Sequence, residues 1–422
     1  MAKQQEPELA NYGGNRHFSR FEWFAAWKVR LPSTAMTTKG GISITNCASD
    51  FGPFGGRVWF NCAHQGPLPR VAVLAAHEAL KQKANPHLIR DDDFTILPNA
   101  LKASLGNLIG AAAEDVILGN SASYGLHVLR NGIRWQAGDE VLLVHGDFPA
   151  TIYPWLGLRD SGVHFRLLTP RGPSLTPDEL KREITPSTRL LCVSWVNSFN
   201  GSILDVAAVG QLCREHGIIF AVNGSQGVGA LQMDVVREPI DALISCGYKW
   251  LCGPYGTGFC WIRPELRDQL KPNQTYWLPH VWGDERMLGY ALKSKTEIGS
   301  AAFDVFCTAN FMNFMPWQAA VDYLLGVGLQ DIQQHNAALT ERLVSRLHST
   351  KYVLIGPPDP ACRSSIVVIS HTTTGRNSQV HARLAQEGID VALRNNNLRF
   401  SLHLFNVAAE VDRAISVLES IG

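Results

Sequence analysis

The sequence predicts an α/β fold, with a large domain built on a mostly parallel sheet and a small C-terminal α+β domain. The chain has 422 residues, of which 45% are hydrophobic, enough for more than one core. Short apolar runs alternate with helical stretches, as expected for parallel strands that are buried on both faces. This pattern changes near residue 315, where a long helical stretch begins. We therefore expect an N-terminal extension at 1–56, a large domain at 57–314 and a small domain at 315–422.

The composition argues against several classes of protein. Only 18% of the residues are charged and the formal net charge is +1, so we expect no basic surface for nucleic acid. The nine cysteines form no CxxC pair and no metal-finger spacing, and there is no HExxH motif. These features predict free thiols in a reducing compartment and no metal. Polar first residues and the lack of an apolar run of about 18 residues predict a soluble, cytoplasmic protein that does not span a membrane.

Aromatic side chains recur at every third position of the extension, at Phe18, Phe21, Phe24 and Trp27. This spacing predicts one face of a helix. The simpler interpretation is an arm that packs on the body of the protein or on a neighbouring subunit. The alternative is a helix that binds a membrane or a partner.

Five apolar runs predict strands of the large sheet, and helical stretches such as 206–217 lie between several of them. The runs lie at 115–120, 139–146, 189–196, 217–223 and 240–246.

The small domain is predicted from a different pattern. It begins with one long helix at 317–349, and a hairpin at 389–403 turns at Asn395–Asn397, because asparagine tolerates positive φ. The remaining predicted elements are strands at 351–356 and 364–370 and helices at 378–388 and 408–420.

Ligands in open α/β sheets bind outside the carboxyl ends of the strands, so the residues that follow each strand form the candidate site. After the first run, the small polar stretch Asn120–Ser123 opens a helix, whose free backbone N–H groups would suit a phosphate. The alternative is that the serine only caps the helix. Phe148 follows the second run and either covers a flat ring or belongs to the core.

Polar residues also follow the later strands. Asn223 and Gln226 either cap a turn or bind a ligand, because a buried amide needs a partner. Burial of Lys249 would lower its pKa and free the amine for a Schiff base; the alternative is a lysine whose amine reaches solvent. Arg399 either binds a carboxylate or lies on the surface.

Together these features match the needs of one cofactor, pyridoxal phosphate (PLP), and an amino-acid substrate. PLP chemistry requires a phosphate cradle, a ring to stack on, polar groups at the ring edge, an amine for an imine and a clamp for the substrate carboxylate. Tyr248 lies beside Lys249 and near enough to serve the phosphate. Gly253, Gly256 and Gly258 allow the following loop to turn tightly near the site.

With these residues and their spacing, the chain resembles the class V aminotransferase superfamily of fold-type I PLP enzymes, which contains cysteine desulfurases and isopenicillin N epimerase. The resemblance runs from about residue 58 to the C-terminus. The stretches that carry it are "NGSQGVGAL" at 223–231, "CGYKWLCGPYGTGF" at 246–259, "TEIGSAAF" at 296–303 and "RFSLHLFN" at 399–406.

The resemblance implies a role for each candidate residue. Lys249 is the Schiff-base lysine that moves the Cα proton, Phe148 replaces the stacking histidine of the desulfurases, and Arg399 holds the substrate carboxylate. Ser300 reaches the phosphate of the other subunit, which implies an obligate homodimer with shared sites. The other implied contacts are with the phosphate (Ser121, Ala122, Tyr248, Cys246), the ring hydroxyl (Gln226, Ser198) and the substrate pocket (His64, for which a structural role is the alternative).

Two departures from the family pattern bear on the reaction. Asn223 stands where the family has an aspartate paired with the pyridine nitrogen, and a neutral amide stabilises no positive charge there. No cysteine occurs from residue 363 onward, where desulfurases carry a nucleophile. We therefore expect an epimerase or a lyase that breaks a C–S bond or eliminates a β-substituent. The alternatives are an aminotransferase and a PLP-binding protein without catalysis.

Overall fold

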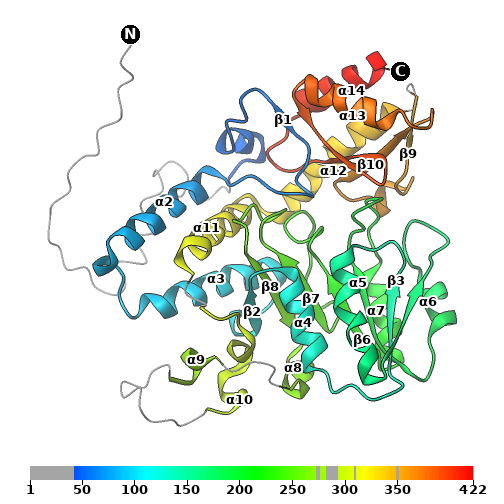
Figure 1. Cartoon of the computed structure of the whole chain (residues 1–422). Coiled ribbons are helices and arrows are strands. Elements are labelled where there is room, and N and C mark those ends of the chain that lie inside the picture. The colour runs from blue at the N-terminus through cyan, green and yellow to red at the C-terminus, as the bar shows by residue number, and fades with distance from the viewer. Residues whose placement is uncertain (1–41, 272–275, 282–292, 308–309, 348–350, 422) are drawn as a thin grey trace. The chain divides into compact units, whose positions relative to one another are not determined.

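The computed structural model describes residues 42–271, 276–281, 293–307, 310–347 and 351–421. Residues 42–422 form one compact unit (Figure 1). The predicted helix that carries Phe18 and Trp27 lies outside the described residues.

A seven-stranded sheet forms the centre of the large domain, in the order β2-β8-β7-β6-β5-β3-β4. The strands from β7 to β4 pair in parallel, whereas β8 is antiparallel to both of its neighbours, β2 and β7. The predicted fold class, α/β with a mostly parallel sheet, is therefore confirmed. The strands are β2 Val116–Gly119, β3 Glu140–Val144, β4 His164–Leu168, β5 Thr188–Ser194, β6 Ile219–Asn223, β7 Ala242–Cys246 and β8 Gly258–Ile262.

Each of the five predicted runs contains or overlaps a strand, but β4 and β8 were not predicted. Strand β4 lies at an edge of the sheet and is only partly buried, so it lacks the apolar run that marks the inner strands. Its Arg166 pairs instead with Glu140 of β3. Strand β8 is fully buried but follows the glycine-rich loop directly, and that loop hides its pattern.

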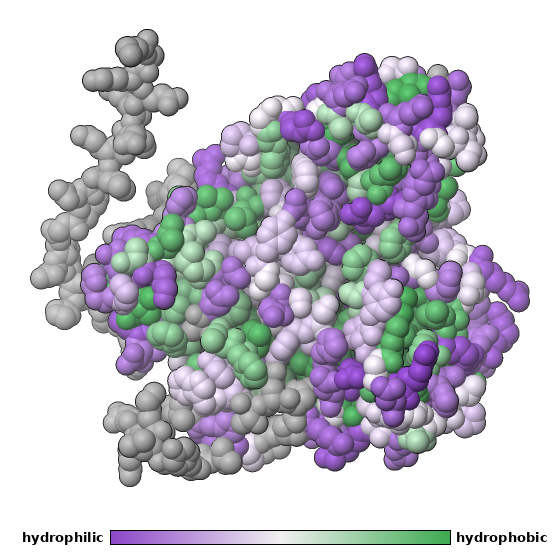
Figure 2. Space-filling view, in the orientation of Figure 1, coloured by the Kyte–Doolittle hydropathy of each residue, from purple (hydrophilic) through white to green (hydrophobic). Residues whose placement is uncertain are grey.

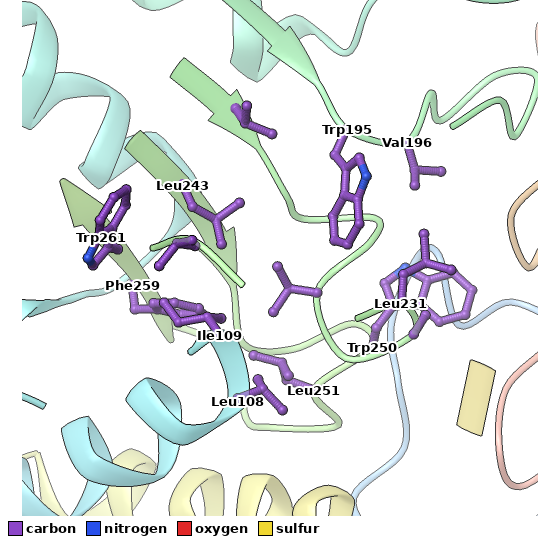
Figure 3. Close-up of a cluster of buried hydrophobic side chains, with 14 of the residues drawn as sticks. Leu108, Ile109, Trp195, Val196, Leu231, Leu243, Trp250, Leu251, Phe259 and Trp261 are labelled. Carbon is purple, nitrogen blue, oxygen red and sulfur yellow. The ribbon is translucent and has the colours of Figure 1, made fainter. Parts of the chain in front are cut away.

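Helices cover both faces of this sheet. Alternate residues of β3 show the division: Leu142 and Val144 belong to one core, and Val141 and Leu143 belong to the other. Figure 3 shows part of the first core, where Phe259 of the sheet lies near Ile109 at the end of α3. Helices α3 Asp93–Ile109, α6 Pro177–Glu183, α7 Val206–Glu215 and α11 Phe311–Val327 contribute to this core, and α4 Ala122–Gly132, α5 Pro149–Leu156 and α8 Pro264–Gln269 to the second.

The long helix predicted at 317–349 is wrong, because the chain forms two helices there. Helix α11 ends at Val327 and α12 spans Leu329–Ser345. Gly328 separates them with φ of +95°, a backbone conformation that side chains other than glycine rarely adopt. Glycine at a helix end is a recognised stop signal, which the apolar periodicity on both sides obscured.

The C-terminal sheet has four strands, in the order β12-β13-β10-β9. The hairpin prediction is confirmed: β12 and β13 are joined by Asn395 and Asn396, whose φ values are +47° and +58°. The elements are β9 Tyr352–Leu354, β10 Ile366–His371, α13 Asn377–Gln386, β12 Ala392–Arg394, β13 Asn397–Ser401 and α14 Ala408–Ile421.

A short strand from early in the chain joins this part of the molecule. Strand β1 Val58–Trp59 pairs in parallel with β11 Ile389–Asp390. The predicted boundary between residues 314 and 315 falls within α11 and stays a prediction. The remaining described helices are η1 Ile44–Asp50, α2 Arg70–Ala84, η2 Pro86–Leu88, η3 Ala113–Asp115, η4 Arg159–Ser161, α9 Trp277–Val281, α10 Lys295–Ile298, η5 Gly299–Phe303 and η7 Pro360–Cys362.

Two further features bear on the kinds of site that the described residues can form. None of their helices combines the length and the apolar character needed to cross a membrane. No group of three or more His, Cys, Asp or Glu side chains among them is placed to hold a metal ion.

Candidate active site

Lys249 lies three residues beyond the end of β7, and only 7% of its surface is exposed. Its Nζ atom is 5.2 Å from the centre of the Phe148 ring and 5.9 Å from that of Tyr248. Within the described part of the chain, this amine donates no hydrogen bond and joins no ion pair. Burial lowers the pKa of Lys249, and the nearby positive charge of Arg399 lowers it further, against opposing effects of Cys246 and Cys62.

Close backbone packing places the lysine. Gly66 donates its N–H to the Tyr248 carbonyl at 2.9 Å, and a Cβ atom at Gly66 would lie 2.0 Å from the Lys249 carbonyl oxygen. A Cβ atom at Gly247 would lie 2.4 Å from Thr257 Oγ1. Glycine is therefore required at position 66, which packs on the lysine backbone, and at position 247, just before the lysine.

Phe148 and Ser121 each stand at the beginning of a helix. Phe148 caps α5, which starts with Pro149, and its ring lies against that of Phe199 with centres 6.4 Å apart. Ser121 caps α4, and its Oγ accepts the N–H of Tyr124. The capping role of Ser121 is thus confirmed, and the N–H groups that begin α4 at Ala122 have no partner within the helix.

Gln226, Ser198 and Arg399 form one hydrogen-bonded group. Gln226 Nε2 donates to Ser198 Oγ at 3.2 Å, and Arg399 Nη1 donates to the Ser198 carbonyl at 3.1 Å. Trp250 Nε1 donates to Gln226 Oε1 at 2.8 Å and so fixes the orientation of that amide. The structure therefore brings together three predicted residues from distant parts of the sequence.

Arg399 is a buried cation without an anionic partner in the described structure. Only 3% of its surface is exposed, and its Nε atom has no hydrogen-bond acceptor. Burial, with a smaller effect of Arg394, lowers the pKa of Arg399 to about 10. His64 is more exposed, and its pKa is lowered by burial and then by the charges of Arg394, Arg399 and Lys249. The guanidinium of Arg399 therefore offers a positive charge and a free donor that suit a carboxylate.

The remaining predicted residues divide into two sets. Asn223 ends β6, Cys246 ends β7, and Tyr248 adjoins Lys249; burial raises the pKa of Tyr248 to about 12. Ser300 is not part of this group in the single chain. It is buried, and its Oγ donates to the carbonyl of Val116, at the amino end of β2.

Sequence reasoning missed two features next to the site. Phe199, which packs on Phe148, follows the β5 strand in a loop without an apolar pattern. Asp147 directly precedes Phe148 and is almost completely buried. The signal for both was their place just beyond a strand end. A cavity of about 280 Å³ also lies at the ends of β3, β4 and β5, and its lining includes Asp147, Phe199 and Asn395 of the hairpin turn.

The residues present fit PLP. An unpaired buried amine at Lys249 can hold its aldehyde, the Phe148 ring 5.2 Å away can cover its face, and the first N–H groups of α4 can hold its phosphate. The orphaned Nε of Arg399 provides a donor for the carboxylate of an amino acid.

Comparison with known proteins agrees with this geometry. The family model described as aminotransferase class-V matches residues 69–413. A probable cysteine desulfurase of Methanothermobacter thermautotrophicus is 23% identical over 398 residues, which cover 86% of this chain and 94% of the relative. An isopenicillin N epimerase of Streptomyces clavuligerus is 31% identical over 229 residues, 51% of this chain and 56% of the relative.

Solved structures show the same fold. The apo structure of a cysteine desulfurase from Thermococcus onnurineus NA1 has a TM-score of 0.79 at 20% identity and covers 90% of this chain and 99% of its own. The cystine C–S lyase C-DES in complex with cysteine persulfide has a TM-score of 0.80 at 19% identity, covering 87% and 99%. Since the family match spans most of the chain, this protein is a PLP-dependent enzyme that belongs to the class-V aminotransferase family.

Proposed function

We propose that the enzyme acts on an α-amino acid or amine and removes the Cα proton with Lys249. The observation that carries this proposal is the Lys249 amine, which is buried, has no partner in the described structure and has a lowered pKa. A general base must be close to the reacting carbon and deprotonated near neutral pH. Both requirements favour this lysine over the exposed ones.

We assign the cofactor contacts as the resemblance implies. Lys249 would hold the aldehyde of PLP, Phe148 would cover the ring, and Asn223 would face the ring nitrogen. PLP, when bound, supplies an electron sink for the electrons left at Cα. The other proposed contacts are Ser121, Ala122, Tyr248 and Cys246 for the phosphate, Gln226 and Ser198 for the ring hydroxyl, and Ser300 for the phosphate of a partner subunit.

Arg399 would bind the substrate carboxylate, and this contact orients the Cα–H bond. Its Nη1 is already fixed by the Ser198 carbonyl, so Nε and the second terminal nitrogen remain to meet the carboxylate. His64 would form part of the wall on the same side, because its pKa responds to both Arg399 and Lys249. The group would therefore bind the substrate carboxylate, orient the Cα–H bond and accept its proton.

For the reaction type we propose epimerisation or β-elimination, including cleavage of a C–S bond, rather than amino transfer. Asn223 is buried and neutral, so it offers the ring nitrogen a hydrogen bond but no charge. Among the described cysteines only Cys307 and Cys362 are exposed, and neither lies between residue 363 and Arg399. The similarity to an epimerase and to a C–S lyase supports the same choice.

The test is hydrogen exchange at Cα in deuterated water, with purified holoenzyme and a panel of L- and D-amino acids, with and without a keto acid. Inversion with deuterium uptake identifies an epimerase, and loss of a β-substituent identifies a lyase. Amino transfer to the keto acid would instead favour the aminotransferase alternative. Bound PLP without exchange of any substrate would favour a non-catalytic binding protein.

A thiol control separates elimination from a persulfide mechanism. We expect Cys307→Ser/Cys362→Ser to release sulfur from cystine or cysteine at the wild-type rate, since elimination needs no protein thiol. Loss of sulfur release in this variant, with PLP still bound, would contradict the proposed lyase mechanism.

We also propose that the enzyme is a cytoplasmic homodimer. Figure 2 shows apolar surface around α2 and α11, and the exposed large apolar side chains there include Leu74, Leu80 and Met312. Patches of this kind often mark subunit contacts. Light scattering should give the mass of two chains for the wild type and of one chain for Leu74→Asp/Leu80→Asp; a monomeric wild type would contradict the proposal.

A further inference from the structure

Four buried polar side chains form a connected group at the carboxyl ends of β3, β5 and β6. They are Asp147, Thr151, Ser194 and Asn223, and we call them the Asp147 network. Their exposed fractions are 5%, 0%, 8% and 4%. Burial of this many polar groups is costly unless each has a partner, so the contacts within the network are informative.

The contacts connect Asn223 to the surroundings of Asp147. Asn223 Nδ2 donates to Thr151 Oγ1 at 2.9 Å, and Thr151 Oγ1 lies 3.3 Å from Ser194 Oγ. The Ser194 backbone N–H donates to Asp147 Oδ2 at 2.8 Å, and the Phe148 N–H donates to Oδ1 at 2.6 Å. A path therefore runs from the carboxylate to Ser194 through its backbone N–H, and from the Ser194 hydroxyl through Thr151 to the amide of Asn223.

Asp147 has no cation beside it in the part of the chain that the structure describes. Its two oxygens accept backbone N–H groups, and no Lys, Arg or His forms an ion pair with it. Burial raises the pKa of Asp147, while hydrogen bonds from Ser194 and Phe148 act in the opposite direction. A buried, unpaired carboxylate is uncommon in protein cores, where such groups are nearly always neutralised.

The hydrogen bonds within the network have a preferred direction. Because Thr151 Oγ1 accepts from Asn223, the hydroxyl proton of Thr151 is available for Ser194 Oγ. A negative charge on Asp147 favours hydroxyl groups whose hydrogens point toward its end of the path. Asn223 Oδ1 accepts the N–H of Ser225 at 3.1 Å, so the two ends of the amide are held by different partners. The amide is thereby held in one orientation.

We propose that Asp147 is a positioning residue for Asn223. Its carboxylate orients Thr151 and Ser194, and through them it fixes which atoms of the Asn223 amide are free to meet the ring nitrogen of PLP. This inference rests on the proposed function, which assigns Asn223 to that nitrogen. Asn223 itself is neutral, so the carboxylate of Asp147 is then the nearest negative charge to it along this path.

The test is a double-mutant cycle with Asn223→Asp and Asp147→Asn, read by the dissociation constant of PLP and by the visible spectrum of the holoenzyme. In the wild-type background, the new carboxylate would share the network with Asp147, and mutual repulsion would keep one of the two protonated. With Asp147→Asn in place, the new carboxylate is ionised. We expect Asn223→Asp to increase PLP affinity by a factor that is at least about five times larger in the Asp147→Asn variant than in the wild type, with a larger change in the visible spectrum.

Asp241 provides a matched control. It also accepts a backbone N–H, from Phe220 at 2.8 Å, but it directly precedes β7 and lies toward the amino end of β6, away from Asn223. Asp241→Asn removes a carboxylate that accepts a backbone N–H and pairs with Arg263 at the opposite end of the strands, so its cycle with Asn223→Asp should be additive. A spectral coupling that is confined to Asp147 is a result that a purely structural role would not produce.

Additive effects of Asp147→Asn and Asn223→Asp, or equal coupling for Asp241, would overturn the inference. If Asp147→Asn does not fold, Asp147→Ser replaces it in the cycle, because this change also removes the charge and keeps a side-chain oxygen that can accept the Ser194 N–H. Coupling is again expected, and additivity again overturns the inference. PLP affinity and the visible spectrum can both be measured without turnover. If Cα hydrogen exchange occurs but the two substitutions are additive, this inference is refuted and the proposed function stands. If the substitutions are coupled but no Cα hydrogen exchanges, the proposed function is refuted and this inference stands.

Discussion

Two lysines are buried in the described part of the chain, and their surroundings differ in one respect. Lys102 is 5% exposed and its Nζ lies 2.7 Å from Asp304 Oδ2, so its charge is neutralised. Lys249 is 7% exposed and has no anionic or hydrogen-bonding partner in the described structure. Lys102 belongs to helix α3 behind the sheet, whereas Lys249 stands beyond the carboxyl end of β7.

The difference shows how the same side chain is used for structure or for chemistry. Both charges of a buried ion pair lose their hydration, so the pair adds little stability compared with two apolar side chains. Removal of one partner alone is costly, because the other charge then stays buried. Asp304 also accepts the N–H of Leu118, which ties the pair to β2. An unpaired buried lysine costs stability, but its amine is a better base and nucleophile. Predictions that break or sharpen this comparison follow from the largest expected effect to the smallest.

Replacement of Lys249 by alanine should have the largest effect on the reaction. We expect Cα hydrogen exchange to fall by about 10²–10⁴-fold, because the variant loses its general base. Deuterium uptake measured by mass spectrometry checks this. Lys249→Arg is the matched control: it keeps the charge but is a poor base, so it should be equally slow. Near-normal exchange in either variant would show that another group removes the proton.

Lys102→Met should weaken the fold and leave the chemistry intact. Because the change removes the ammonium beside a buried carboxylate, we expect a loss of about 3–5 kcal/mol in the free energy of unfolding, measured with denaturant. Lys102→Met/Asp304→Asn should recover much of this loss, since the amide oxygen still accepts from Leu118. A single variant as stable as the wild type would contradict the structural role of the pair.

Arg399→Lys tests the other buried cation of the site. The ammonium cannot reproduce the forked donors of the guanidinium, so we expect kcat/KM to fall by about 10–100-fold, mostly through a higher KM. Steady-state kinetics with one amino acid and with its decarboxylated amine gives the measurement. Equal losses for both substrates would argue that Arg399 does not hold the carboxylate.

The unpaired charge of Lys249 should also be visible in the pH dependence of stability. Burial lowers its pKa in the folded apo-protein, whereas a lysine in the unfolded chain titrates near 10.4. Between these two values the unfolded state binds more protons, so the penalty is complete below the folded pKa and fades as pH rises toward about 10.4.

Apo Lys249→Met should therefore be more stable than the apo wild type near pH 7, by about 1 kcal/mol, and this gain should shrink toward pH 10. Thermal unfolding of both proteins at several pH values checks the sign. A gain that is constant with pH would show that packing, and not charge, is responsible.

Part of the site could be predicted from local sequence. Lys249 lies three residues beyond an apolar run, Phe148 and Ser121 lie just after two others, and Asn223 ends a fourth. The rule that parallel strands present their carboxyl ends to ligands was therefore enough to select them as candidates. The turn at Asn395 and Asn396 was predicted for a similarly local reason, the tolerance of asparagine for positive φ.

Other parts could not be predicted because they depend on residues far apart in the chain. Arg399 meets Ser198 only because the C-terminal sheet packs against the loop after β5. The Asp147 network joins three strand ends and α5, and no spacing in the sequence reveals it. The break at Gly328 was missed since apolar periodicity continues on both sides of it.

The sequence by itself determined the α/β class, the inner strands and the cofactor, and it selected Lys249 as the candidate to carry that cofactor, because each depends on a short pattern and on its place in a parallel sheet. Only the tertiary structure decided which charges are paired. Lys102 and Lys249 both follow apolar residues in sequence, and only the arrangement in space places Asp304 beside one and an aromatic ring beside the other. Hydration and Coulomb energies depend on distance in space, and short sequence patterns do not contain that distance.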